Sequence, residues 1–398
     1  MRSVHGDFPQ LNTSPYVYFD SAATTYKPSC VIDAISEFYT RFNAPVHRAV
    51  YQPSIVATEL YEKARQKVAT FINAPSSEEV IFTRGATDSL NILADSFAHS
   101  MLTPQSRILV SEMEHHSNLI PWQMAASFSG ASLEPIPMTD EGKLSIDALQ
   151  ALLARGNVCV VAVTHCSNTL GSLTPIQEIS KIVHAHKAFL IVDGAQAVPH
   201  VSVDVRSLGC DAYAFSGHKM YGPTGIGVLW AKRALLESLS PVRGGGDMID
   251  VVSFASSTWA DLPQRFEPGT PPVAEAIGLG AAIDYLASLD GIAEYEQALY
   301  TRLYDVLKAI PDVQLVGTLQ PRAPLQAFFV PGAHPLDIAT LLDLSKIAVR
   351  SGHLCCQPLL KRLGVTSLVR ASLSFYNSFD EIELFGDALN QAIRKLKR

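Results

Sequence analysis

The strongest constraint on the fold of this chain is an alternation of short apolar segments and amphipathic segments between about residues 79 and 230. The apolar segments have the length and β-branched character of strands. They lie at 80–82, 108–110, 158–163, 189–192, 212–215 and 226–230. Several are apolar on both faces, which is typical of strands that helices cover on each side. Between two of them, Leu90, Leu93 and Phe97 recur at helical spacing. The alternation predicts an α/β domain with a mostly parallel, mixed sheet and helices on both faces.

The pattern changes after a glycine-rich stretch at 243–246. Residues 273–310 are predicted to be mostly long helix. Predicted strands then follow at 325–330, 347–349 and 368–375, with helices near 335–344 and 380–396. A length of 398 residues fits two domains. We predict a large domain over 15–280 and a smaller α+β domain over 281–398, with segment 1–14 packing on the smaller domain.

Composition excludes several classes of protein. The net charge is −7, so the chain lacks the excess of basic residues that is typical of a nucleic-acid-binding protein. No run approaches the roughly 18 apolar residues of a membrane span, and the first residues lack the apolar core of a signal peptide. The six cysteines are scattered, which fits reduced thiols better than a disulfide framework. We expect a cytoplasmic enzyme that binds neither nucleic acid nor a membrane.

Ligands in open α/β sheets bind beyond the carboxyl ends of the strands, so the residues after each predicted strand are the candidates for function. The turn at 83–88 contains small residues, and backbone N–H groups near Ala86 would suit a phosphate. An ordinary turn in which Thr87 caps the following helix is the alternative. After the next strand, His115 and His116 could ligate a metal, stack on a flat cofactor, or bind nothing. No second ligand cluster with zinc-type spacing accompanies them.

Two charged residues follow later strands. Asp193 comes directly after one apolar run, and Lys219 lies in the loop after another. Taken singly, Asp193 could be a helix cap and Lys219 a surface lysine. Together with the turn at 83–88, they meet the three needs of pyridoxal 5′-phosphate. These are a carboxylate for the ring nitrogen, an amine for the aldehyde, and a cradle for the anion.

Three stretches carry a resemblance to a known family: 18–25 (Tyr-Phe-Asp-Ser-Ala-Ala-Thr-Thr), 193–196 (Asp-Gly-Ala-Gln) and 215–225, which contains Ser-Gly-His-Lys. They resemble the class V, fold-type I pyridoxal-phosphate enzymes, and specifically the cysteine desulfurases. The resemblance runs from about residue 18 to residue 376. A further stretch, 350–355 (Arg-Ser-Gly-His-Leu-Cys), is similar to the Arg-x-Gly-His-His-Cys signature of the Suf-type (group II) enzymes.

In the Suf-type enzymes a short loop carries the Cys that forms a persulfide, and Cys355 matches it. The flanking Arg350 and His353 would favour its thiolate. This chain departs from the family pattern twice. Leu354 replaces the usual second His, and Cys356 occupies a position that is commonly Ala.

The resemblance implies an enzyme that converts L-cysteine to L-alanine and supplies sulfur for iron–sulfur cluster assembly. The catalytic residues that it implies are Lys219, Cys355 and His115. Besides Lys219, the cofactor-binding residues that it implies are Asp193, Gln196, His115, Ala86, Thr87, Ser216, His218 and Thr270. The expected substrate-binding residues are Arg370, which would clamp the carboxylate, Asn168 and Arg350. No metal is expected.

The resemblance also implies partners. Thr270 lies in a stretch, 266–271, that resembles the family segment reaching the cofactor phosphate of a second subunit, which implies a homodimer. A sulfur-acceptor protein of the iron–sulfur assembly system is the other expected partner. Two alternatives stay open: a selenocysteine lyase, and a non-catalytic metal scaffold that uses His353, Cys355 and Cys356.

Overall fold

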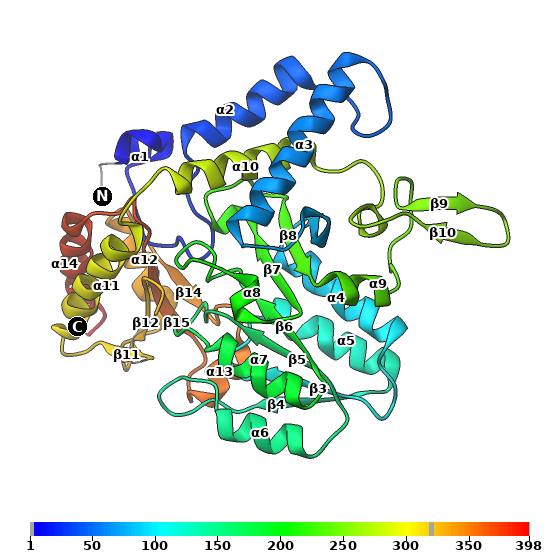
Figure 1. Ribbon diagram of the computed structural model, residues 1–398. Coiled ribbons are helices and arrows are strands. Elements are labelled where there is room, and N and C mark those ends of the chain that lie inside the picture. Colours follow the sequence, from blue (N-terminus) through cyan, green and yellow to red (C-terminus); the bar gives the residue numbers. More distant parts are fainter. Residues whose placement is uncertain (1–3, 318–321, 398) are drawn as a thin grey trace.

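The computed structural model describes residues 4–317 and 322–397 (Figure 1). Its largest element is a seven-stranded sheet with the order β2-β8-β7-β6-β5-β3-β4. Strands β3 to β7 run parallel to one another, whereas β8 is antiparallel to its neighbours β7 and β2. The strands are β2 (Val80–Thr83), β3 (Arg107–Ser111), β4 (Ser132–Ile136), β5 (Val158–Thr164), β6 (Phe189–Asp193), β7 (Ala212–Ser216) and β8 (Gly227–Ala231). The predicted α/β class with a mostly parallel, mixed sheet is confirmed.

Helices cover both faces of this sheet. Side chains alternate along each strand, so a strand with apolar residues at successive positions presents an apolar surface on each face. Val161 belongs to a core shared with the helices α3 (Gln52–Phe71), α6 (Ile146–Ala154), α7 (Ile176–Ala185) and α10 (Val273–Ala287). Its neighbour Val160 belongs to the opposite core, shared with α4 (Ala86–Ser100), α5 (Ile120–Ser129) and α9 (Arg233–Ser238). Strands that are apolar on both faces therefore do form the centre of the molecule.

The edge strand β4 is a strand that sequence reasoning missed. Its segment contains Glu134 and Pro135 and shows no apolar alternation. Proline has no N–H group for a central strand, but an edge strand tolerates it. β4 pairs only with β3 in the sheet order, so the outer side of Pro135 needs no partner strand.

A second, antiparallel sheet has the order β11-β12-β15-β14. Its strands are β11 (Gln314–Val316), β12 (Leu325–Phe329), β14 (Arg350–Gly352) and β15 (Leu368–Ser372), and the helices α11 (Ile292–Lys308), α12 (Pro335–Leu344) and α14 (Phe379–Leu396) pack on it. The region 273–310 forms two helices, α10 and α11, rather than one. The predicted domain boundary near residue 280 falls inside α10, which contacts α2 (Ser29–Glu37) and α3.

The N-terminal segment joins the two sheets. Strand β1 (Val17–Tyr18) pairs with β13 (Ile347–Ala348) beside the smaller sheet. Phe19 O then accepts a hydrogen bond from Ser372 N at 2.8 Å, and six residues later Thr25 N donates to His218 O at 3.1 Å. The smaller sheet and the loop that carries Lys219 are thus linked by one short stretch of chain.

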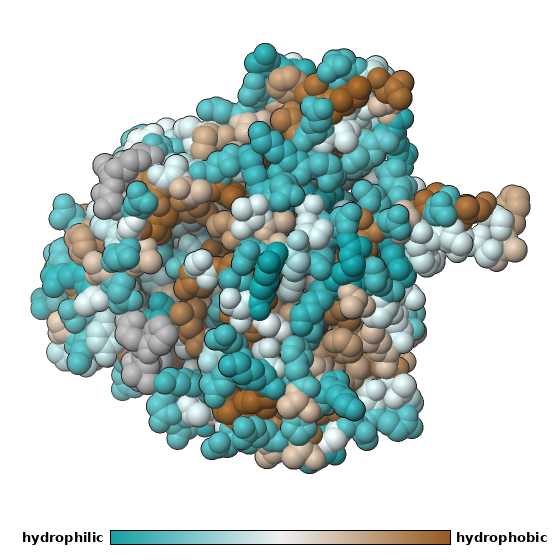
Figure 2. All heavy atoms as spheres, viewed as in Figure 1, coloured by the Kyte–Doolittle hydropathy of each residue, from teal (hydrophilic) through white to brown (hydrophobic). Residues whose placement is uncertain are grey.

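The hairpin of β9 (Ile249–Val252) and β10 (Ser257–Trp259) projects from the body of the molecule (Figure 1). It exposes Val251, Val252 and Phe254, and its apolar residues stand out in Figure 2.

Among residues 4–317 and 322–397, no single helix has the length and hydropathy needed to cross a membrane. Helices α10 and α11 pass that test only as a pair, with a bend of 82° between them.

Candidate active site

A cavity of about 260 Å³ lies where the carboxyl ends of the parallel strands face the smaller sheet. Every residue predicted for catalysis, cofactor or substrate lines it, except Thr270. These residues are Ala86, Thr87, His115, Asn168, Asp193, Gln196, Ser216, His218, Lys219, Arg350, Cys355 and Arg370. Thr270 is exposed and lies outside the cavity of its own chain. The fold therefore brings together residues from seven separate stretches of sequence.

Asp193 and Lys219 meet because β6 and β7 are neighbours in the sheet. Asp193 is the last residue of β6, and Lys219 lies in the short turn that follows β7. Burial lowers the pKa of Lys219, although Asp193 offsets part of that effect. Burial likewise raises the pKa of Asp193, against the hydrogen bond from Ala195 N at 2.9 Å. A lowered pKa favours the neutral amine, and the neutral amine is the form that attacks an aldehyde.

The turn between β2 and α4 has the geometry of an anion cradle. Gly85 occupies the cap position before α4, and it has no side chain that could cap the helix. The N–H group of Ala86 donates to Ser216 Oγ at 2.8 Å, which draws the turn onto the end of β7. Thr87 Oγ1 contacts Ser117 Oγ at 2.7 Å, so Thr87 does not serve as the helix cap. The positive end of α4 therefore faces the cavity, as a phosphate site requires.

His115 lines the same cavity as a neutral ring. Ser117 N donates to its Nδ1 at 3.1 Å, which assigns any proton on the neutral ring to Nε2. Burial, with Lys219 as the next contributor, lowers the pKa of His115 to about 3. His116 is not among the residues that line the cavity, and its backbone N–H donates to Cys355 O at 2.7 Å. In the described part of the chain, no three His, Cys, Asp or Glu side chains gather closely enough to hold a metal ion.

Cys355 lines the cavity from a constrained loop and is half-buried. Leu354 and Cys355 both have left-handed backbone angles, with φ of 51° and 56°. A non-glycine residue in the left-handed region of backbone angles destabilises the fold by on the order of 1–3 kcal/mol. The large domain holds this conformation through His116 and through Asn168 Nδ2, which donates to Leu354 O at 2.8 Å. The thiol is therefore presented by contacts that span both sheets.

The neighbouring thiol is in a different environment. Cys356 is fully buried, lies outside the cavity lining, and places its Sγ 2.8 Å from Thr169 Oγ1. Burial raises the pKa of Cys356 to about 11. A buried, protonated thiol is a poor nucleophile. Of the two adjacent cysteines, Cys355 is the one that lines the cavity.

Two arginines give the cavity a positive wall. Arg350 and Arg370 lie directly opposite each other on the paired strands β14 and β15. Arg370 donates to Asp20 Oδ1 at 3.0 Å and to Asn168 O at 2.9 Å. Its Nε is buried and has no partner among the described residues. A buried guanidinium with an unused donor is suited to bind a carboxylate.

Sequence reasoning missed the partner of this arginine. Asp20 holds Arg370 from one side, and burial raises the pKa of Asp20 against the opposing effect of Arg370. Asp20 lies within the stretch 18–25 that carried the family resemblance, so that stretch was the signal that could have identified it. Further lining residues that were not predicted to bind a ligand are Ala22, Ala23, Ser117, Thr164, Cys166, Ala195 and Leu354.

Residues 17–385 match the family described as Aminotransferase class-V. This chain belongs to the class V aminotransferase family. The predicted resemblance to that family is confirmed. A probable cysteine desulfurase of Halalkalibacterium halodurans is 47% identical over 390 residues, which cover 98% of this chain and 95% of the relative. A cysteine desulfurase of Klebsiella pneumoniae is 45% identical over 403 residues, which cover 100% and 98% of the two chains.

Solved structures agree with this class V assignment. The apo cysteine desulfurase of Thermococcus onnurineus NA1 superposes with a TM-score of 0.94 at 38% identity, over 99% of each chain. The S-sulfonic acid form of the cysteine desulfurase CsdA from Escherichia coli gives a TM-score of 0.92 at 38% identity, over 98% of each chain. This chain therefore shares its fold with both solved cysteine desulfurases over nearly its whole length.

Proposed function

We propose that this chain is a pyridoxal 5′-phosphate-dependent cysteine desulfurase that converts L-cysteine to L-alanine and takes up the sulfur on Cys355. The observation that carries this proposal is the placement of Lys219, Asp193, Arg370 and Cys355 around one cavity. A desulfurase needs an amine for the cofactor, a carboxylate for its ring nitrogen, a cation for the amino-acid carboxylate and a thiol for the sulfur. The names of the full-length relatives support the same reaction.

The residues around the cavity fit the cofactor. Gln196 Oε1 is buried without a partner among the described residues, so it can accept a hydrogen bond from a ring hydroxyl. Ala86, Ser216 and His218 would hold the phosphate at the positive end of α4. When bound, pyridoxal phosphate supplies an electron-accepting ring that stabilises negative charge at the substrate Cα. His115, which lines the same cavity, would lie against that ring.

The chain's own residues would divide the work as follows. Asp193 holds the proton on the ring nitrogen, and the neutral amine of Lys219 moves the proton at Cα. The Cys355 thiolate then attacks the sulfur of L-cysteine. A sulfur–sulfur bond forms and the carbon–sulfur bond breaks, leaving its electron pair on Cβ. Protonation of that carbon releases L-alanine and leaves a persulfide on Cys355.

Arg370 is expected to set the affinity for the amino-acid carboxylate. We expect Arg370→Lys to raise KM for L-cysteine about 10- to 100-fold, because a single ammonium cannot replace a forked guanidinium held by Asp20 and Asn168. Steady-state kinetics over a range of L-cysteine concentrations measures this change. An unchanged KM would assign the carboxylate to Arg350 instead.

The finer features of the function are also proposals. We assign the chain to the Suf-type subgroup on the stretch 350–355, with a protein of the iron–sulfur assembly system as sulfur acceptor. The exposed Thr270 supports a homodimer in which each subunit reaches the cofactor phosphate of the other. The six free thiols support a reducing compartment, and we propose the cytoplasm.

Incubating the holoenzyme with L-cysteine and with L-selenocysteine tests the proposed reaction. We expect alanine to form from L-cysteine, with sulfur appearing on the peptide that contains Cys355 by mass spectrometry. Alanine from L-selenocysteine alone would assign the chain as a selenocysteine lyase. A colourless protein that neither retains pyridoxal phosphate nor forms alanine would contradict both assignments.

A further inference from the structure

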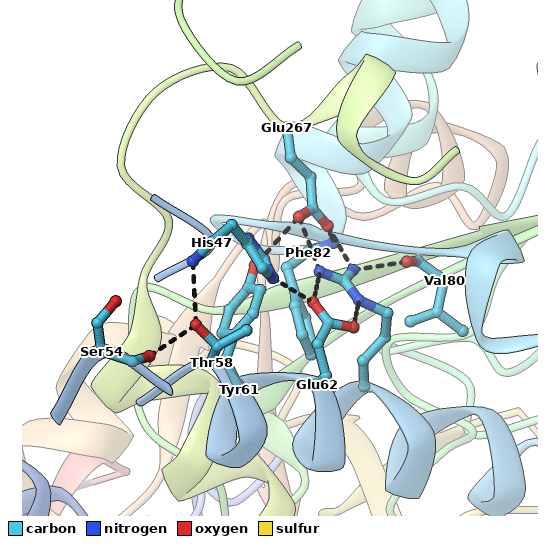
Figure 3. Close-up of polar contacts among 9 residues, drawn as sticks. His47, Ser54, Thr58, Tyr61, Glu62, Val80, Phe82 and Glu267 are labelled. Atoms are coloured by element: carbon cyan, nitrogen blue, oxygen red, sulfur yellow. Dashed lines mark hydrogen bonds and ion pairs between the residues drawn. The ribbon is translucent and has the colours of Figure 1, made fainter. Parts of the chain in front are cut away.

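A buried ion pair outside the cavity joins α3 to the segment that follows the β9–β10 hairpin. Arg65 has 1% of its side chain exposed and Glu267 has 8%. The Arg65 Nη1 and Nη2 atoms contact Glu267 Oε1 and Oε2 at 2.6 and 2.9 Å. The guanidinium also stacks on the rings of Tyr61 and Phe82, at 5.0 and 4.7 Å from their centroids. Figure 3 shows Tyr61, Phe82 and Glu267 converging on this point.

This pair takes the place of a neighbouring strand at the edge of the large sheet. β2 is an edge strand, so its outer backbone groups have no partner among the strands that the structure describes. Glu267 Oε1 accepts a hydrogen bond from Phe82 N at 2.6 Å, and Arg65 Nη1 donates to Val80 O at 2.8 Å. One acid and one base thereby satisfy an outward N–H and an outward C=O of β2.

The fixed edge of β2 leads directly into the anion cradle. Phe82 is followed by Thr83, which pairs with Gly227 of β8. Gly85 then lies so close to Gly227 that a Cβ at position 227 would approach the Gly85 Cα to 2.3 Å. Since only two residues separate Phe82 from Gly85, a shift of β2 would move the turn that presents Ala86.

The other end of the pair leads to the segment of Thr270. Glu267 is followed by Pro268 and Gly269, and Gly269 N donates to Gly246 O at 2.9 Å. Glu267 thus fixes the start of the segment that is proposed to reach the second subunit. The pair therefore connects two stretches of chain that are assigned to a phosphate: β2, which leads to the turn at 83–87, and the segment that begins at Glu267.

The Arg65 guanidinium keeps its positive charge in this buried position. Burial acts to lower the pKa of Arg65, but Glu267 outweighs that effect and the pKa lies above its ordinary value. Arg65 Nε also donates to Glu62 Oε2 at 3.0 Å. A buried ion pair is often no more stabilising than apolar residues of the same volume. Unlike apolar residues, however, this ion pair makes directional hydrogen bonds, and these hold two backbone segments in defined positions.

We propose that Arg65 and Glu267 are a positioning pair for the phosphate end of the cofactor. The pair holds the edge of β2, and through it the turn at 83–87, in register with the segment 268–270. This inference rests on the proposed function, because it takes pyridoxal phosphate as the ligand. Neither residue lines the cavity, so the pair acts through the backbone that it fixes.

The test compares two ligands that differ only in the phosphate. Apo-protein of full length is titrated with pyridoxal 5′-phosphate and with pyridoxal, and binding is followed by absorbance. For Glu267→Gln we expect binding of pyridoxal phosphate to weaken about tenfold or more, with pyridoxal affinity within about twofold of wild type. Arg65→Lys, which keeps the charge but loses the fork, should give a smaller loss in the same direction.

Glu134→Gln is the matched control. Glu134 pairs with Arg107 at 2.6 Å near the opposite edge of the same sheet, far from the turn at 83–87. We expect this variant to lower the melting temperature without changing the affinity for either ligand. Equal weakening of both ligands in Glu267→Gln would overturn the proposal, as would unchanged affinities or the failure of both the Glu267 and Arg65 variants to fold. A wild-type protein that binds neither ligand would instead refute the proposed cofactor.

Discussion

Replacing Cys355 with alanine is expected to slow alanine formation from L-cysteine at least about 1,000-fold, because the variant has no thiolate to accept the sulfur. The reason is geometric: Cys355 faces the cavity, whereas Cys356 is buried against Thr169. Binding of pyridoxal phosphate should be unchanged, since Cys355 lies in the loop after β14 and not in the turn between β2 and α4 that forms the anion cradle. Alanine quantification, with the cofactor spectrum recorded in parallel, measures both effects.

Cys356→Ala is the matched control for this prediction. It removes the adjacent thiol, whose pKa is raised to about 11 by burial, so activity should stay within about twofold of wild type. The free energy of unfolding should instead fall by on the order of 1 kcal/mol, because the substitution leaves a small void in the core. A loss of activity as large as that of Cys355→Ala would show that the buried thiol relays sulfur.

Replacing Lys219 with alanine is expected to abolish covalent attachment of the cofactor and to lower activity at least about 1,000-fold. The amine is positioned beside Asp193 at the ends of two neighbouring strands, and burial lowers its pKa, which favours the neutral nucleophile. In the wild type, borohydride reduction should fix the cofactor to the peptide that contains Lys219. Peptide mass spectrometry reads out the attachment directly.

Lys181→Ala is the control for the lysine prediction. Lys181 is exposed on α7, on the surface of the large domain, and is not part of the cavity. Its replacement should leave both the attached cofactor and the rate unchanged. Cofactor fixed by borohydride to a peptide other than the one containing Lys219 would refute the assignment of that lysine.

Much of the large sheet could be predicted from apolar patterning. Each of the six strands predicted between residues 79 and 230 overlaps a strand of the large sheet, because buried central strands require nearly continuous apolar sequence. Patterning failed at β4, where an edge position tolerates Pro135. It also merged α10 and α11, since both are helical and only a break after Ala287 separates them.

The sequence by itself determined the chemistry available at the strand ends. Asp193 and Lys219 follow apolar strands, and parallel strands end at the same edge of a sheet, so their proximity follows from local pattern and topology alone. The thiol loop was identified from the resemblance of the stretch 350–355 to the Suf-type signature, which the sequence also contains.

Only the tertiary structure decided which side chains hold these groups in place. Asp20 and Arg370 are 350 residues apart, Asn168 and Leu354 are 186 apart, and Arg65 and Glu267 are 202 apart. Apolar periodicity fixes which face of an element is buried, but it carries no information about which distant polar atom meets it there. Such pairs form because a buried charge or polar group must find a partner, and the folded chain alone sets which partner lies within reach.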